Sequence, residues 1–186
     1  MPKPLIAYYS RRGQNYVNGQ VEELRVGNTE LVSGILRTLT GGDYLEIRQK
    51  IPYDADYYRC IDQAHRDLLS DARPELTGLP ESIAAYDTVY LGYPNYWGAL
   101  PRAVCTFLEA YDWTGKRIKP FCTHEGGGVG RSLNELKQLC PGAELLSPLA
   151  LWGAGRQYDL SVIQEWVEGT EPASNKIQAK TGSILR

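Results

Sequence analysis

Short apolar runs alternate with amphipathic stretches along almost the whole chain. The apolar runs cover residues 5–9, 44–47, 88–92, 118–123 and 144–151. Several of them are too continuously apolar for a strand with one face in water, and such runs are typical of parallel strands that are covered on both faces. The pattern therefore predicts five buried, parallel strands.

The amphipathic stretches carry apolar residues at helical spacing. These residues recur within 31–39, 61–68, 104–111, 133–140 and 160–167. Five β-α units with right-handed crossovers predict an α/β fold with a doubly wound five-stranded parallel sheet in the order 2-1-3-4-5 and helices on both faces. We expect Asn28 or Thr29 to cap the first helix and Gly41 to end it, and Pro101 to lie in a first helical turn.

Length and charge restrict the classes of protein. The chain has 186 residues, 42% hydrophobic and 23% charged, which suits one domain. We expect this domain to span residues 1–168, and residues 169–186 to be a mobile tail or surface strap. A net charge of -2 gives no basic field for nucleic acid. No apolar run approaches the roughly 20 residues of a membrane span or forms a signal peptide, so we expect a cytoplasmic protein without a membrane partner.

The four cysteines are Cys60, Cys105, Cys122 and Cys140, and no two of them form a CxxC pair. Such spacing indicates neither a disulfide framework nor a zinc site, so we expect reduced thiols and no metal. Cys122 and His124 lie two residues apart and could share a strand face. A cysteine–histidine nucleophile is therefore a minor alternative.

Three chemically unusual loops follow the first, third and fourth predicted strands, at residues 10–28, 93–100 and 124–131. These strands are central neighbours in the predicted order, and doubly wound sheets bind ligands at the carboxyl ends of such strands. The first loop is far longer than the about two to six residues of a usual strand-to-helix join. Its arginines, glycines and hydroxyl groups, followed by a helix N-terminus, predict a phosphate site. The absence of GxxxxGK(S/T) and GxGxxG argues against an ATPase and a dinucleotide site.

The second and third loops predict a site for a flat ring. Tyr93, Tyr96 and Trp97 follow a buried strand, where exposed aromatic rings favour a planar partner, although Tyr93 could equally pack against the next helix. The third loop is rich in glycine, which lets a ligand edge approach the backbone. His124 and Glu125 can donate or accept hydrogen bonds there.

The segments "SRRGQNY", "GNT", "LGYPNYWG" and "CTHEGGG" together resemble the flavodoxin-like family, in particular a branch with a long phosphate loop. The resemblance spans about residues 5–167 and implies a three-layer sandwich that binds FMN. It places the phosphate at Ser10, Arg12, Gly13, Gln14, Asn15, Tyr16 and Thr29. It places the flavin ring between Pro94, Asn95, Tyr96, Trp97 and Gly98 on one side and Thr123, His124, Glu125, Gly126 and Gly128 on the other.

This resemblance implies an electron carrier of the flavodoxin type, which passes electrons between redox partners without a catalytic residue of its own. Many flavodoxins place a tyrosine in the third loop, whereas this chain has glycines, so one flavin face would be open to a nicotinamide or quinone. An FMN-dependent NAD(P)H or quinone oxidoreductase is therefore the alternative. An interaction domain would leave the three loops unexplained. The sequence does not predict the oligomeric state.

Overall fold

The computed structural model describes residues 3–153 and 158–169. The chain divides into two compact units, residues 1–156 and residues 157–186. The described part of the second unit contains one helix, α5 (Leu160–Glu168), which begins after Asp159 and ends at Gly169 in the left-handed conformation. The predicted tail lies outside the described residues, except for Gly169, and the predicted domain boundary stays a prediction.

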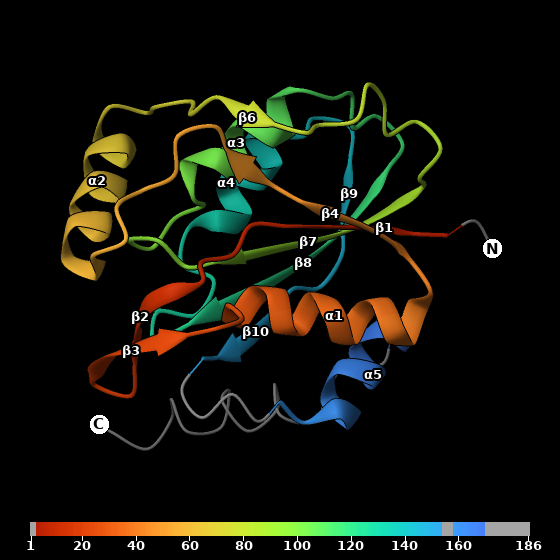
Figure 1. Ribbon diagram of the computed structural model, residues 1–186. Coiled ribbons are helices and arrows are strands. Elements are labelled where there is room, and N and C mark those ends of the chain that lie inside the picture. The colour runs from red at the N-terminus through yellow and green to blue at the C-terminus, as the bar shows by residue number, and fades with distance from the viewer. Residues whose placement is uncertain (1–2, 154–157, 170–186) are drawn as a thin grey trace, which may run out of the picture. The chain divides into compact units, whose positions relative to one another are not determined.

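The first unit contains a parallel sheet in the order β10-β8-β7-β1-β4, with β9 also paired to β8 (Figure 1). Its strands are β1 (Leu5–Tyr8), β4 (Asp43–Glu46), β7 (Thr88–Pro94), β8 (Arg117–His124), β9 (Glu144–Leu145) and β10 (Leu149–Trp152). The predicted α/β fold and strand order are confirmed. Most residues of β1, β7 and β8 are buried, as expected for central parallel strands.

The predicted fifth strand is divided into β9 and β10, and both pair with β8. Arg117 lies opposite Glu144, whereas Phe121 lies opposite Leu149, so the outer strand has one extra residue between these two pairs. An extra residue on one strand is the definition of a bulge. Pro148 lies in this interruption and has no backbone N–H to donate to the sheet.

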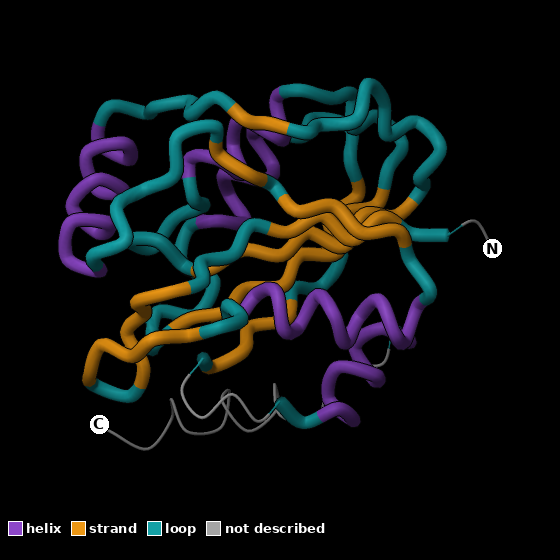
Figure 2. Tube along the Cα trace, in the orientation of Figure 1, coloured by secondary structure: helices purple, strands orange, loops and turns teal. Residues whose placement is uncertain are grey.

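The described part of the first unit contains four helices. They are α1 (Asn28–Thr40), α2 (Tyr57–Leu69), α3 (Arg102–Glu109) and α4 (Ser132–Leu139). Figures 1 and 2 show α1 on one face of the sheet and α3 and α4 on the other. Gly41 ends α1 in the left-handed conformation, as predicted, but the residue before the helix is Gly27 rather than Asn28 or Thr29. Among the described residues no helix has the length and apolar character needed to cross a membrane.

The long first loop is not irregular, because most of it forms an antiparallel hairpin of β2 (Gly13–Val17) and β3 (Gln20–Leu24). Asn18 and Gly19 make the turn with φ values of 49° and 93°. Positive φ at both central residues is the requirement of the type I′ turn, for which Asn-Gly is strongly preferred. A further small pair, β5 (Arg48–Gln49) with β6 (Leu76–Thr77), lies between β4 and β7 in the chain.

The two ends of the hairpin meet beside the start of α1. A Cβ atom on Gly27 would lie only 2.2 Å from Ser10 Oγ and 2.5 Å from the Arg11 carbonyl oxygen. Ser10 Oγ accepts a hydrogen bond from the Glu30 backbone N–H at 3.1 Å and so satisfies one of the free N–H groups of the first helical turn. The hairpin is therefore an insertion into a short loop that joins β1 directly to α1.

Candidate functional site

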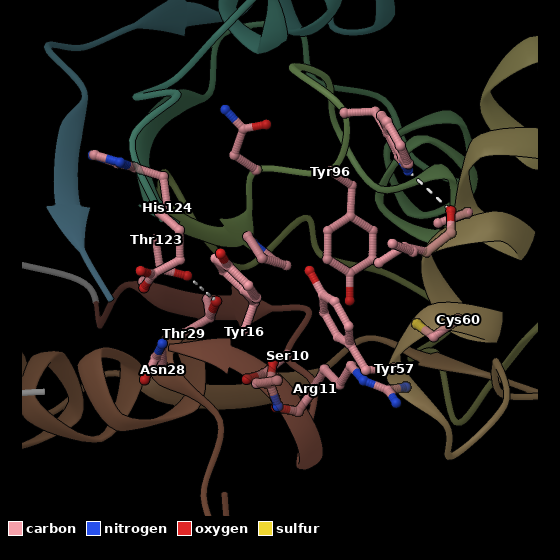
Figure 3. A pocket seen from close by; sticks show the side chains of 17 residues that line it. Ser10, Arg11, Tyr16, Asn28, Thr29, Tyr57, Cys60, Tyr96, Thr123 and His124 are labelled. Carbon is pink, nitrogen blue, oxygen red and sulfur yellow. Dashed lines mark hydrogen bonds between the residues drawn. The ribbon is translucent and has the colours of Figure 1, made fainter. Parts of the chain in front are cut away.

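A cavity of about 300 Å³ lies at the carboxyl ends of β1, β7 and β8 and is also bounded by the hairpin and α2 (Figure 3). Its lining residues are Ser10, Arg11, Asn15, Tyr16, Asn28, Thr29, Tyr57, Cys60, Ile61, Ala64, Pro94, Asn95, Tyr96, Trp97, Thr123, His124 and Glu125. The three loops singled out in the sequence all contribute to this list. Most residues predicted for the site therefore lie around one cavity.

Six predicted site residues do not line this cavity, namely Arg12, Gly13, Gln14, Gly98, Gly126 and Gly128. Arg12 makes two hydrogen bonds to the Glu30 carboxylate, at 2.7 and 2.6 Å, and is directed away from the cavity. The neighbouring Arg11 lines the cavity instead, with its guanidinium held by the carbonyl oxygens of Gln14 and Ala55, both at 2.8 Å. The two arginines directly precede β2 and have different partners, and only Arg11 lines the cavity.

One end of the cavity is built by the start of α1. Thr29 Oγ1 and Thr123 Oγ1 are 2.8 Å apart, so this end is tied to the end of β8. The side-chain oxygen of Asn28 is buried and has no hydrogen-bond partner among the described residues. Together with the N-terminal N–H groups of α1, this polar end suits an anion and hydroxyl donors.

The second loop makes a tight turn at Trp97 and Gly98, which have φ values of 56° and 75°. The Trp97 indole N–H donates to the Ile61 carbonyl oxygen at 3.0 Å, and its ring stacks on His65 with centroids 4.3 Å apart. Trp97 thus lines the cavity and also contacts α2. Tyr93 is fully buried and its hydroxyl contacts Ser132 Oγ of α4 at 2.9 Å, so Tyr93 packs into the core and does not line the cavity.

Asn95 joins the second loop to the third. Its Nδ2 donates to the Gly128 carbonyl oxygen at 2.7 Å, and its Oδ1 accepts from the Gly98 N–H at 2.8 Å. A Cβ atom on Gly127 would lie 2.8 Å from Asn95 Nδ2, so the glycine allows this close approach. Two of the third-loop glycines thus shape the contact between loops without lining the cavity themselves.

His124 contributes a neutral imidazole to the cavity wall. Burial lowers the pKa of His124 below its usual value. Its Nδ1 accepts a hydrogen bond from the Gly126 backbone N–H at 3.0 Å, which places the proton of the neutral ring on Nε2. His124 is therefore a hydrogen-bond donor at neutral pH. Its ring also packs edge to face against the Trp152 ring, with centroids 5.4 Å apart.

Helix α2 supplies a wall that the sequence interpretation missed. Tyr57, Cys60, Ile61 and Ala64 lie on one helical face at spacings of three and four residues and line the cavity. Tyr57 also stacks on Tyr16 of the hairpin, with ring centroids 6.0 Å apart. The apolar spacing of α2 was visible in the sequence, but nothing in it indicated which surface this face would cover.

The cysteine–histidine alternative finds no support in the geometry. Cys122 is fully buried, and burial raises the pKa of its thiol to about 12. A nucleophilic cysteine needs a lowered pKa and access to substrate. The pKa of Cys60 in the cavity wall is also raised by burial. All four cysteines are free thiols.

The sequence profile described as Flavodoxin matches residues 24–170. Two provisionally named flavoproteins of known structure are similar in sequence and fold. The protein from Bacteroides eggerthii is 27% identical, with a TM-score of 0.72 and coverage of 90% of this chain and 96% of that chain. The protein from Bacteroides uniformis is 26% identical, with a TM-score of 0.69 and coverage of 89% and 97%.

A flavoprotein from Lactobacillus acidophilus, crystallised in complex with FMN, shares the fold at 18% identity, with a TM-score of 0.61 and coverage of 90% of this chain and 99% of that chain. The search among curated proteins finds no significant relative. The resemblance predicted from the loop segments is confirmed by the profile match, which covers most of the sequence. This chain belongs to the flavodoxin family.

Proposed function

We propose that this flavodoxin-family protein binds FMN in the cavity formed by its three loops and α2, and carries electrons between redox partners. The family and the fold support FMN as the cofactor, since the Lactobacillus acidophilus protein of the same fold was crystallised with it. When bound, FMN supplies the redox chemistry, while the protein provides orientation and electrostatics.

The polar end of the cavity fits the phosphate and the hydroxylated chain of FMN. Ser10, Thr29 and the first N–H groups of α1 would hold the phosphate, because helix N-termini favour anions. Asn28 has a buried side-chain oxygen without a partner among the described residues, and a hydroxyl group of the ligand would satisfy it. Arg11 adds a positive charge to the same cavity.

The other end of the cavity fits a flat ring system. Tyr16, Tyr57, Tyr96 and Trp97 all line it, and aromatic side chains favour stacking or edge contacts with planar ligands. His124 offers a neutral N–H donor. This combination of aromatic and hydrogen-bonding side chains matches the flavin ring better than an aliphatic or purely charged ligand.

The size of the cavity is the observation that favours a carrier over an oxidoreductase. Cys60, Ile61 and Ala64 of α2 close the cavity beside the second loop, where the Ile61 carbonyl oxygen accepts from the Trp97 indole N–H. A volume of about 300 Å³ lies at the lower end of the range for small-molecule sites, so it suits one cofactor rather than a cofactor with a nicotinamide or quinone beside it. We therefore infer that electrons are exchanged with partners that dock outside the cavity.

The experiment compares two assays of the purified protein. First, denaturation of a yellow preparation should release FMN, and a colourless preparation that ignores added FMN would refute the cofactor assignment. Second, the FMN-loaded protein should not oxidise NADH or NADPH with a quinone unless a flavodoxin reductase is added. Rapid turnover without the reductase would establish the alternative, an FMN-dependent NAD(P)H or quinone oxidoreductase.

The free thiols agree with a cytoplasmic setting for either role.

A further inference from the structure

Trp97 has a backbone conformation that its side chain does not favour. Tyr96 and Ala99 exchange backbone hydrogen bonds at 3.2 and 3.0 Å around a two-residue turn formed by Trp97 and Gly98. Both central residues have positive φ, at 56° and 75°. For a bulky residue such as Trp97 a positive φ is a genuine outlier, whereas glycine adopts it without penalty.

The chain provides an internal comparison for this turn. The β2–β3 hairpin turns at Asn18 and Gly19, which also have positive φ. Asparagine tolerates this conformation and Asn-Gly is the preferred pair for such turns. At the second turn a tryptophan stands where the hairpin has its asparagine. Contacts outside the turn must therefore hold Trp97 in place.

The end of the turn is fixed by an ion pair between the buried Arg102 and the partly buried Glu135. Arg102 is only 6% exposed and donates from its guanidinium to the Leu100 carbonyl oxygen at 2.9 Å. Glu135 Oε2 accepts from the Leu100 N–H at 2.8 Å, and Glu135 Oε1 pairs with Arg102. The two side chains thus hold both backbone groups of Leu100, the neighbour of Ala99, which pairs with Tyr96 across the turn.

The pair is well satisfied in its surroundings. A third side chain, Asp71, accepts from Arg102 at 3.0 Å. Burying charged groups is costly unless they are paired and hydrogen-bonded. Here the Arg102 guanidinium binds two carboxylates and the Leu100 carbonyl oxygen, and the Glu135 carboxylate binds Arg102 and the Leu100 N–H. Neither Arg102 nor Glu135 lines the cavity, so neither can act on a ligand there except through the turn.

The start of the turn and the indole ring have their own contacts. Asn95 Oδ1 accepts from the Gly98 N–H, and the Gly98 carbonyl oxygen accepts from the Arg131 N–H, both at 2.8 Å. The Trp97 ring is held by Ile61 and by stacking on His65. The turn is thus fixed on both sides, and the half-exposed Trp97 ring is held against α2 at the edge of the cavity.

We infer that Arg102 and Glu135 are positioning residues that hold Trp97 in its left-handed turn and thereby set how tightly the cavity binds its flavin and at what potential the flavin is reduced. This inference rests on the proposed FMN site. The two residues act from behind the loop, through Leu100, and touch no cofactor atom. Their loss should loosen the turn before it unfolds the protein.

The test compares Glu135→Ala with a matched control, Glu109→Ala. Each substitution removes a carboxylate that pairs with an arginine, since Glu135 pairs with Arg102 and Glu109 pairs with Arg73 at 2.8 Å. Within the described part of the chain, Glu109 makes no contact with the turn. In the FMN-free protein, the Tyr96 and Ala99 amides of Glu135→Ala should exchange hydrogen about tenfold faster, because their mutual pairing opens more often. In Glu109→Ala the two amides should exchange as in the wild type.

The flavin readouts are the FMN dissociation constant and the midpoint potential at saturating FMN. Glu135→Ala should weaken FMN binding by about tenfold and shift the potential, and Glu109→Ala should change neither. If Glu135→Ala does not fold, the double variant Arg102→Met with Glu135→Met replaces the pair by apolar side chains, a change that folded proteins often tolerate. The double variant should show the same faster exchange and weaker binding.

Wild-type exchange at Tyr96 and Ala99 in the folded Glu135→Ala or double variant would overturn the inference. Faster amide exchange with unchanged FMN affinity and unchanged midpoint potential would also overturn it. In that case Arg102 and Glu135 would hold the turn without affecting the flavin. If the wild-type protein itself fails to bind FMN, the proposed function is wrong. The amide exchange of the FMN-free protein still decides whether Arg102 and Glu135 hold the turn.

Discussion

Thr29 Oγ1 and Thr123 Oγ1 lie 2.8 Å apart, so a single side-chain hydrogen bond joins the first turn of α1 to the end of β8. Both side chains are buried, and the Thr29 carbonyl oxygen also accepts from the Ser33 hydroxyl at 2.7 Å. The polar end of the cavity and the start of the glycine-rich loop are therefore joined to each other directly.

Thr123→Val should destabilise the protein and weaken FMN binding. Valine keeps the shape of threonine but leaves the buried Thr29 hydroxyl without this partner, which costs about 1 to 3 kcal/mol. Denaturant unfolding of the FMN-free protein and fluorescence titration with FMN measure the two effects. Thr38→Val is the control, because Thr38 is exposed on the same helix as Thr29. Equal losses in the two variants would contradict a special role for the threonine pair.

Gly27→Ala should disrupt the join between the hairpin and α1. The added Cβ atom would lie 2.2 Å from Ser10 Oγ and 2.5 Å from a backbone oxygen, so the phosphate end must move. We expect a loss of about 1 to 3 kcal/mol from overpacking, together with loss of FMN binding. Gly34→Ala in the same helix meets no atom within 4 Å and should stabilise the protein by about 0.5 to 1 kcal/mol. Thermal melts and FMN titration check both variants.

The unfolding free energy should depend on the protonation of His124. Burial lowers the pKa of His124 in the folded state, so between that pKa and about 6.5 the unfolded chain binds more protons than the folded one. The free energy of unfolding should therefore rise with pH across this window and lose the His124 contribution below it. Subtracting the profile of His124→Asn from that of the wild type isolates the effect. A flat difference between pH 5 and 7 would rule out this coupling.

The Cys122 thiol should be unreactive in the folded protein. Its pKa is raised to about 12 by burial, so almost no thiolate is present at pH 8. A thiol-specific chromogenic disulfide should label all four cysteines after denaturation but not Cys122 in the native state. Cys122→Ala should retain FMN binding and electron transfer. Abolished electron transfer with intact FMN binding would revive the nucleophile alternative.

The fold could be predicted from the sequence because it depends on patterns that are local and repeated. Continuous apolar runs indicated the parallel strands, and helical spacing indicated the helices between them. The bulge between β9 and β10 is harder to predict from the sequence, because a single extra residue changes the strand pairing without changing the apolar pattern. Pro148 was the available signal for an interruption in that strand.

Most residues predicted for the site line the cavity, and their roles in binding stay predictions. Residues 10–28 were interpreted as an irregular loop, although Asn18-Gly19 between Tyr16-Val17 and Gln20-Val21 is a strong hairpin signal. The family resemblance places Arg12 at the phosphate, whereas Arg11 is the arginine that lines the cavity. The α2 wall is a different case, because the surface that a helix face covers depends on tertiary contacts between segments far apart in the sequence.

The hairpin leaves and rejoins the chain at neighbouring points, since Gly27 packs directly against Ser10. Its length is thus independent of the distance that the connection from β1 to α1 must span. Related proteins could shorten, extend or replace this arm without displacing the sheet, and a protein engineer could exchange it in the same way. Any new arm would still have to supply the side of the cavity that Asn15 and Tyr16 now provide.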